Sequence, residues 1–427
     1  MSQPVSTAST SIRLSVMMFL QFFVWGAWFV TIGVFLRQGM NFPEGIGTAY
    51  SVGPLAAIFA PLILSMFADR LFPTQVVLGA LHLIGGVLLF LVPWAVQQDV
   101  GSDTNWFFWV LLAYMLCYMP TLGLSNSLAM SNIANTEKQF PIIRVFGTIG
   151  WIAAGFLVGT LLQADATALP LQVAGGASLA LGVYSFFLPH TPPPAKGQPM
   201  SVVKALGLES LSMLRSLPFA VFAIASLLIC IPLQAYYAYA ATFVTDAGFT
   251  SAAGAMIWGQ ISEIAFMLVI PVLFVRLGVK WMLAIGMACW VLRYALFAVG
   301  APEGVFWMLM LGILLHGICY DFFFVTGQIY TDKKAPPAMR AQAQGFLVVL
   351  TQGIGMYVGA KVNAGVFAAK VDASGAEALS QWPSFWWFPA IFAGVILILF
   401  LVLFHDRVKT GVDEVVDTVG DTPETIQ

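Results

Sequence analysis

Charged residues are scarce in this sequence. Only 9% of its 427 residues are Asp, Glu, Lys or Arg, whereas 59% are hydrophobic. Soluble globular proteins carry about 25% charged residues, so this chain has too few to cover a water-facing surface. The net charge of -2 also gives no basic surface for nucleic acid. The composition excludes a soluble enzyme, a disordered chain and a nucleic-acid-binding protein. It predicts an all-α protein that crosses the bilayer several times.

Cysteine is rare as well, and the motifs of common catalytic sites are missing. The four cysteines lie in apolar segments and are spaced neither as metal ligands nor as a disulfide framework. Glycine-rich phosphate loops, HExxH and CxxC motifs, and a nucleophile elbow in the right context are absent. We therefore expect no enzyme activity, no metal and no cofactor.

Long apolar runs dominate what is present. About 20 apolar residues cross the roughly 30 Å core of a bilayer. The run that begins at Leu14 follows a mostly polar start, which indicates a first spanning helix and not a cleaved signal peptide. Twelve spans are predicted, at residues 14–36, 46–68, 75–96, 105–131, 142–163, 170–188, 218–244, 254–275, 281–300, 304–330, 341–367 and 384–404.

The break between the sixth and seventh spans differs from the others. Residues 189–217 contain a proline run followed by Lys196, Lys204, Glu209 and Arg215, which suits a linker with a short amphipathic helix. The predicted fold is therefore twelve transmembrane helices in two six-helix halves. The predicted divisions are an N-terminal half, a cytoplasmic linker, a C-terminal half and a polar cytoplasmic tail, at residues 1–188, 189–217, 218–404 and 405–427.

The basic residues predict the orientation. With both termini in the cytoplasm, 13 of the 18 Lys and Arg residues lie on the cytoplasmic side, and only Arg37 and Lys370 lie outside. This asymmetry follows the positive-inside rule. The two halves also resemble each other, because Cys117-Tyr118 in the fourth span has a counterpart in Cys319-Tyr320 of the tenth. With the Asp69-Arg70 pair after the second span, these features resemble the major facilitator superfamily, which is built from repeats.

Ionisable and polar residues within the spans are the candidate functional residues, because the bilayer penalises them by roughly 2.5–3.5 kcal/mol each. In the fifth span, Arg144, Thr148 and Trp151 follow i, i+4, i+7 spacing and share one helix face. Such a face can line a polar cavity. The alternative is that Arg144 lies at the cytoplasmic interface and extends its charged end into water.

Three further spans carry candidate site residues. In the eighth span, Gln260 and Glu263 share a face, and a carboxyl group removed from water is suited to proton coupling. The alternative is a structural carboxylate paired with a basic residue. The remaining candidates are Gln234 and Tyr237 in the seventh span, and His316, Tyr320 and Asp321 in the tenth.

Asp321 also has a structural interpretation, because Phe322, Phe323 and Phe324 follow it directly. A carboxylate in such surroundings needs a cavity or a cation. The alternative to a functional role is an ion pair with Arg144, Arg293 or Lys361. A lone histidine such as His82 in the third span is interpreted as a packing residue.

The chain resembles the nucleoside:H+ symporter family of the major facilitator superfamily, the bacterial nucleoside permeases. The resemblance extends over almost the whole chain. It is carried by segments such as Phe19-Leu20-Gln21-Phe22, Tyr118-Met119-Pro120-Thr121, Arg144 with Gly147-Thr148, Gln260-Ile261-Ser262-Glu263, Leu292-Arg293 and Asp321-Phe322-Phe323.

The resemblance implies where the nucleoside site lies. Its residues would be Arg144, Thr148, Trp151, Gln234, Tyr237, Gln260, Glu263, His316 and Tyr320, with Glu263 or Asp321 as the proton-coupling group. Trp151 and Tyr320 stand where the family typically has phenylalanine. Tyr237 replaces an asparagine and His316 replaces a tyrosine.

The expected function is proton-coupled nucleoside uptake by alternating access across the cytoplasmic (inner) membrane. The expected partners are a nucleoside, a proton and the lipid bilayer, with no nucleic acid, and the expected state is a monomer. Two alternatives stay open at this point. One is a permease for another polar solute, such as a sugar or glycoside, and the other is a membrane receptor that binds without transporting.

Overall fold

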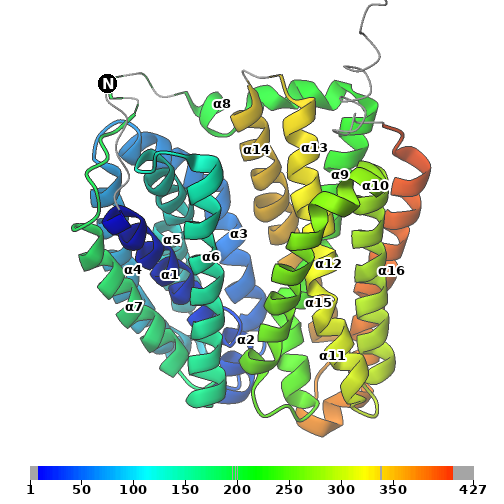
Figure 1. Ribbon diagram of the computed structural model, residues 1–427. Coiled ribbons are helices and arrows are strands. Elements are labelled where there is room, and N and C mark those ends of the chain that lie inside the picture. The colour runs from blue at the N-terminus through cyan, green and yellow to red at the C-terminus, as the bar shows by residue number, and fades with distance from the viewer. Residues whose placement is uncertain (1–7, 195, 198, 200, 337–338, 407–427) are drawn as a thin grey trace, which may run out of the picture.

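The structure is a computed structural model that describes residues 8–406, apart from 195, 198, 200, 337 and 338. All regular elements in this part of the chain are helices (Figure 1). Eleven of the described helical segments are long and apolar enough to cross a membrane. A helix satisfies its own backbone hydrogen bonds, which is what an apolar chain in lipid requires.

Six spans form the N-terminal group of helices, blue to teal in Figure 1. Several spans contain a π-helical segment that continues an α-helix. The elements are α1 (Ala8–Trp28) with α2 (Ile32–Val34) and η1 (Phe35–Gly39), α3 (Gly45–Ile63) with η2 (Leu64–Ala68), α4 (Thr74–Asp99), α5 (Trp106–Ser131), α6 (Thr136–Gly155) with η3 (Phe156–Leu161), and α7 (Leu169–Ser185).

The sixth predicted span is α7, which has 17 residues. It is therefore shorter than the eleven segments above, each of which has at least 19. It packs against α4 and α1 and completes the N-terminal group. With α7, the predicted set of twelve spans is confirmed.

The C-terminal group contains the other six spans. The elements are α9 (Leu217–Asp246), α10 (Ala252–Gly300), α11 (Phe306–Leu314) with α12 (His316–Tyr320), η5 (Asp321–Val325) and α13 (Thr326–Lys334), then α14 (Arg340–Val348) with η7 (Val349–Gly355) and α15 (Met356–Lys370), η8 (Gly375–Ser380), and α16 (Trp382–Leu403).

α10 contains two predicted spans, the eighth and the ninth. They are separated only at Gly278, whose φ of 71° lies in the left-handed region that favours glycine. One part of α10 runs from Ala252 to this bend and the other from the bend to Gly300, in agreement with the spans predicted at residues 254–275 and 281–300. The polar residues around Gly278 therefore form a sharp bend and not an extended loop.

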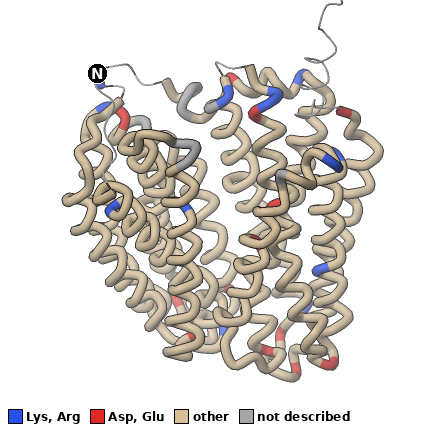
Figure 2. The backbone as a smooth tube through the Cα atoms, in the orientation of Figure 1, with Lys and Arg blue, Asp and Glu red and all other residues tan. Residues whose placement is uncertain are grey.

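The segment between the two groups runs along the end of the bundle where the N-terminus lies (Figure 1). It contains the short helix α8 (Val202–Ala205) and the 3-10 helix η4 (Leu208–Arg215). Charged positions gather at the two ends of the bundle, and few lie in its middle (Figure 2). This distribution is what a bilayer around the middle of the bundle requires.

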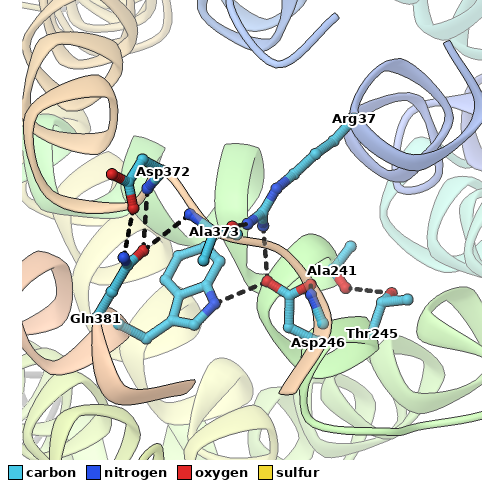
Figure 3. Close-up of polar contacts among 9 residues, drawn as sticks. Arg37, Ala241, Thr245, Asp246, Asp372, Ala373 and Gln381 are labelled. Carbon is cyan, nitrogen blue, oxygen red and sulfur yellow. Dashed lines mark hydrogen bonds and ion pairs between the residues drawn. The ribbon is translucent and has the colours of Figure 1, made fainter. Parts of the chain in front are cut away.

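The two groups contact each other at the opposite end, which we call the closed end. Arg37 of the first span forms an ion pair with Asp246 of α9, with 2.7 Å between Nη1 and Oδ2 (Figure 3). Asp246 also accepts hydrogen bonds from the indole N–H of Trp382, at 2.8 Å, and from the backbone N–H of Gly375, at 2.8 Å. Arg37 donates in addition to the carbonyl oxygen of Ala373. These buried contacts come from both groups and hold them together.

A second contact at the closed end involves Asp165, in the loop between η3 and α7. Its Oδ2 accepts a hydrogen bond from the backbone N–H of Ala252, at 2.7 Å, where α10 begins. A carboxylate at a helix N-terminus complements the orphan N–H groups and the helix dipole. Burial nevertheless raises the pKa of Asp165 above its ordinary value.

Candidate functional site

A cavity of about 500 Å³ lies between the two groups of helices. Both groups supply its walls, and it reaches Leu64, Asn126 and Val348 near the end of the bundle opposite the closed end. Nine residues predicted as the binding site line this single cavity. They are Arg144, Thr148, Trp151, Gln234, Tyr237, Gln260, Glu263, His316 and Tyr320.

The α6 wall follows the predicted helix face. Arg144, Thr148 and Trp151 line the cavity, while Ile142 and Val145 on other faces of α6 are 64% and 52% exposed. The Arg144 guanidinium lies over the ring of Phe22 in α1, with 4.1 Å between Cζ and the ring centroid. A cation held over an aromatic face is stabilised by the ring quadrupole. Arg144 therefore lines the cavity wall, as the first of the two interpretations predicts.

The α10 wall carries the predicted carboxylate. Glu263 lies in the cavity wall with Gln260, one turn away, and its Oε2 is 3.9 Å from Nε2 of His316. Among the described residues, His316 is the one basic side chain within 4.0 Å of Glu263. The Oε1 atom of Gln260 has no hydrogen-bond partner in the described part of the chain. The wall therefore offers a carboxyl group and an uncommitted amide oxygen.

Aromatic rings surround His316 and close the cavity on the C-terminal side. His316 stacks on Tyr236 with a centroid distance of 5.1 Å and an interplanar angle of 20°. Tyr237 and Tyr320 contact the same imidazole at 6.1 and 5.9 Å. On the N-terminal side, Trp151 meets Trp25 edge to face at 5.5 Å. Rings from both groups thus face the space between them.

Asp321 lies apart from these residues. It does not line the cavity and is fully buried at the start of η5. Neither carboxyl oxygen has a hydrogen-bond or ion-pair partner within the described ranges. Within the described residues Asp321 forms no ion pair with any of the three candidate cations, so the predicted alternative of a structural pair is not found here. Each of these cations lies over an aromatic ring. Arg144 lies over Phe22, Arg293 over Tyr236 and Lys361 over Tyr357.

Gln234 makes a contact that the sequence pattern does not indicate. Its amide Nε2 donates a hydrogen bond to the carbonyl oxygen of Tyr50, at 2.9 Å, and so connects α9 with α3 of the other group. A residue that lines the cavity thereby also joins the two groups of helices.

Other residues of the cavity wall were not among the predictions. Phe29, Tyr50, Asn126 and Gln352 line the cavity as well. Asn126 and Gln352 are polar residues within apolar runs, the same signal that selected Gln260. Phe29 and Tyr50 carry no such signal. His82, interpreted as a packing residue, bonds Gln21 at 2.8 Å and Ser178 at 3.0 Å, so its ring is fixed by buried polar partners.

Twelve spanning helices in two groups around a central cavity define a transporter of the major facilitator type. Transporters related only by fold include an auto-inhibited peptide transporter of the POT family. Its crystal structure superimposes with a TM-score of 0.69 at 14% identity, covering 94% of this chain and 98% of that one. The chain itself belongs to the nucleoside H+ symporter family, whose pattern it matches over residues 8–409.

Relatives of similar length support this assignment. YegT of Escherichia coli (strain K12) is 41% identical over 408 residues, covering 93% of this chain and 94% of the relative. The xanthosine permease of the same organism is 31% identical, covering 93% and 95%. A crystal structure of the nucleoside transporter NupG superimposes with a TM-score of 0.81 at 30% identity, covering 93% and 100%. The protein is thus a multi-pass membrane transporter and not an enzyme.

Proposed function

We propose that this protein takes up nucleosides together with protons across the cytoplasmic membrane. The observation that carries the proposal is the cavity itself, which brings a cation, a carboxyl group, amides and aromatic rings together from both groups of helices. Membership of the nucleoside H+ symporter family supports the same substrate and the same coupling ion.

The chemistry of the walls suits a neutral polar ligand with an aromatic base. Trp151, Tyr237 and Tyr320 offer ring faces on which a base can stack. Gln260 and Gln234 carry amides that both donate and accept, as ribose hydroxyls and base edges require. Thr148 and Arg144 add a hydroxyl and a permanent cation. A volume of about 500 Å³ lies within the range typical of small-molecule sites.

Glu263 is the proposed proton-coupling group. It lies in the same wall as Gln260, so a bound nucleoside would cover it and exclude water from the carboxyl group. Protonation of Glu263 then depends directly on whether a nucleoside occupies the cavity. Asp321 is the second candidate, because a carboxyl group with no cationic partner is costly to bury in its charged form.

The two-group architecture supports alternating access as the transport mechanism. The groups, proposed as residues 1–188 and 218–404, would rock about the central site. The excess of basic residues on the linker side supports a cytoplasmic location for both termini and the linker. The cavity reaches toward that side, and the closed end then faces outward. The cavity is lined from both groups of one chain, which supports a monomer as the transporting unit.

The test is uptake into proteoliposomes with a panel of nucleosides, with and without an inward proton gradient. Accumulation of nucleosides that increases with the gradient is expected. Sugars and glycosides are added as competitors. If these compounds are transported and nucleosides are not, the substrate is another polar solute. Nucleoside binding without accumulation under any gradient would instead indicate a receptor and contradict the proposal.

A further inference from the structure

The first span is interrupted at the level of the cavity. α1 ends at Trp28, α2 begins at Ile32, and residues 29–31 form a turn. The hydroxyl group of Tyr50 donates a hydrogen bond to the carbonyl oxygen of Phe29, at 2.7 Å. Thr31 Oγ1 donates to the carbonyl oxygen of Trp28, at 3.1 Å. Polar groups of an interrupted helix need such partners within a membrane. Side chains therefore support a break that contains neither glycine nor proline.

Phe29 lies at this break and faces the ligand cavity. It also lines a second cavity of about 30 Å³, whose other residues include Val30 and Ala241. Its ring is 5.1 Å from that of Tyr50 and 6.1 Å from that of Trp151 within its own group of helices. It is also 6.0 Å from that of Tyr237 in the other group. Phe29 thus lies where the cavity and both groups of helices meet.

The segment beyond the break reaches the closed end. Residues 32–39 comprise α2 and η1 and include Arg37, which forms the buried ion pair with Asp246 (Figure 3). Gly33 brings this segment directly against α9, because a Cβ atom there would be 3.1 Å from the carbonyl oxygen of Ala238. Residues 32–39 are therefore attached to the other group of helices, while the break separates them from α1.

We propose that Phe29 contacts the nucleoside and that residues 32–39 link occupancy of the cavity to the Arg37–Asp246 ion pair. The proposal rests on the proposed function. Ligand that enters the cavity moves the Phe29 ring. Because residues 29–31 interrupt the helix, residues 32–39 can then move while α1 stays in place. Charged pairs that are buried and hydrogen-bonded lose most when only one partner is displaced. The ion pair and its Trp382 and Gly375 contacts therefore respond to a small shift.

The first experiment measures amide hydrogen exchange of the full-length protein in lipid nanodiscs, with adenosine, with uridine and without ligand. In the wild-type protein, ligand is expected to change exchange in residues 30–39. In Phe29→Ala, this change is expected to disappear, while equilibrium binding weakens about two- to tenfold through lost ring contact. Phe23→Ala, which lies in α1 and away from the cavity, is the matched control and should behave as wild type.

The second experiment needs no ligand. Asp246→Asn is expected to raise exchange several-fold in residues 32–39 and around Trp382, with residues 8–28 unchanged. Trp382→Phe removes one hydrogen bond to Asp246 and should give a smaller increase. Lys334→Gln breaks the 2.7 Å Lys334–Asp406 pair within the C-terminal group and should leave the closed end unchanged.

Two results would overturn the inference. One is a ligand-dependent change in residues 30–39 that is the same in Phe29→Ala as in wild type. The other is unchanged exchange of residues 32–39 in both Asp246→Asn and Trp382→Phe. Absence of nucleoside binding to the wild-type protein would instead contradict the proposed function, and the ligand-free experiment would still test the segment.

Discussion

At the residue scale, Trp151 is the side chain whose role in the cavity is simplest to test. It lines the cavity on α6 and meets Trp25 edge to face. If a base stacks on it, Trp151→Ala should weaken nucleoside binding by about 0.5–1.5 kcal/mol, in addition to the lost burial. Trp151→Phe keeps a ring face and should have a mild effect. Competition binding with a radiolabelled nucleoside measures both, and equally small losses would place Trp151 outside the binding contacts.

Glu263 and Asp321 differ in their surroundings, so their amide variants should behave differently. Glu263→Gln mimics the protonated acid in the cavity wall. It should bind nucleoside and support counterflow, but should not accumulate nucleoside under an imposed proton gradient. Concentrative uptake by Glu263→Gln, measured in proteoliposomes at several pH values, would transfer the coupling role to Asp321 or His316.

Asp321→Asn serves as the comparison. Because Asp321 has no ion-pair partner among the described residues, its replacement leaves no buried cation behind. We therefore expect normal folding, with any loss confined to transport. A large fall in melting temperature in detergent would show that Asp321 has a structural partner in another state of the transporter.

At the scale of elements, close contact between α1 and α6 shapes one side of the cavity. A Cβ atom on Gly150 would lie 2.1 Å from the carbonyl oxygen of Phe19, which is backbone and cannot turn aside. Gly150→Ala should therefore destabilise the protein by about 1–3 kcal/mol through overpacking. Gly176→Ala on α7 meets no atom within 4 Å and is the control. Thermal unfolding in detergent compares the two, and equal stability would contradict the close packing.

Asp165 joins two elements of different groups, α10 and the loop before α7, and its contact should depend on pH. Burial raises its pKa in the folded protein, so the folded state binds this proton more tightly than the unfolded state. This contribution to stability is present at low pH and is lost as pH rises from the ordinary value of about 4 through the raised value. Asp165→Asn should remove this part of the pH dependence of the melting temperature. If the melting temperatures of the wild-type protein and Asp165→Asn depend on pH in the same way, this role of Asp165 is contradicted.

At the scale of the whole molecule, the spans were predictable because the bilayer demands long apolar helices. The predicted span 105–131 corresponds to Trp106–Ser131, and 46–68 to Gly45–Ala68. The predicted spans 254–275 and 281–300 lie on either side of the bend at Gly278, which a sharp turn in the left-handed region makes within α10. Helix periodicity also placed Arg144, Thr148 and Trp151 on one wall.

Contacts between distant helices were less predictable. Periodicity gives the face of a residue but not the helix that this face meets. The partners of His82 therefore had no signal in the sequence, and neither did the lack of an ion pair for Asp321 among the residues that the structure describes. The break at Phe29 had none either, since hydrogen bonds from Tyr50 and Thr31 support it and no glycine or proline marks it.

The short α7 has a consequence for the lipid around the molecule. At 1.5 Å per residue, its 17 residues extend about 25 Å, a few Å less than the hydrocarbon core of a typical bilayer. It packs on α4 and α1 and presents Val183, which is 54% exposed, to the lipid side. Hydrophobic mismatch of this kind thins the adjacent bilayer or tilts the helix. A change in acyl chain length therefore acts on the N-terminal group of helices through α7. Membrane thickness is thus expected to affect the N-terminal group more than the C-terminal group.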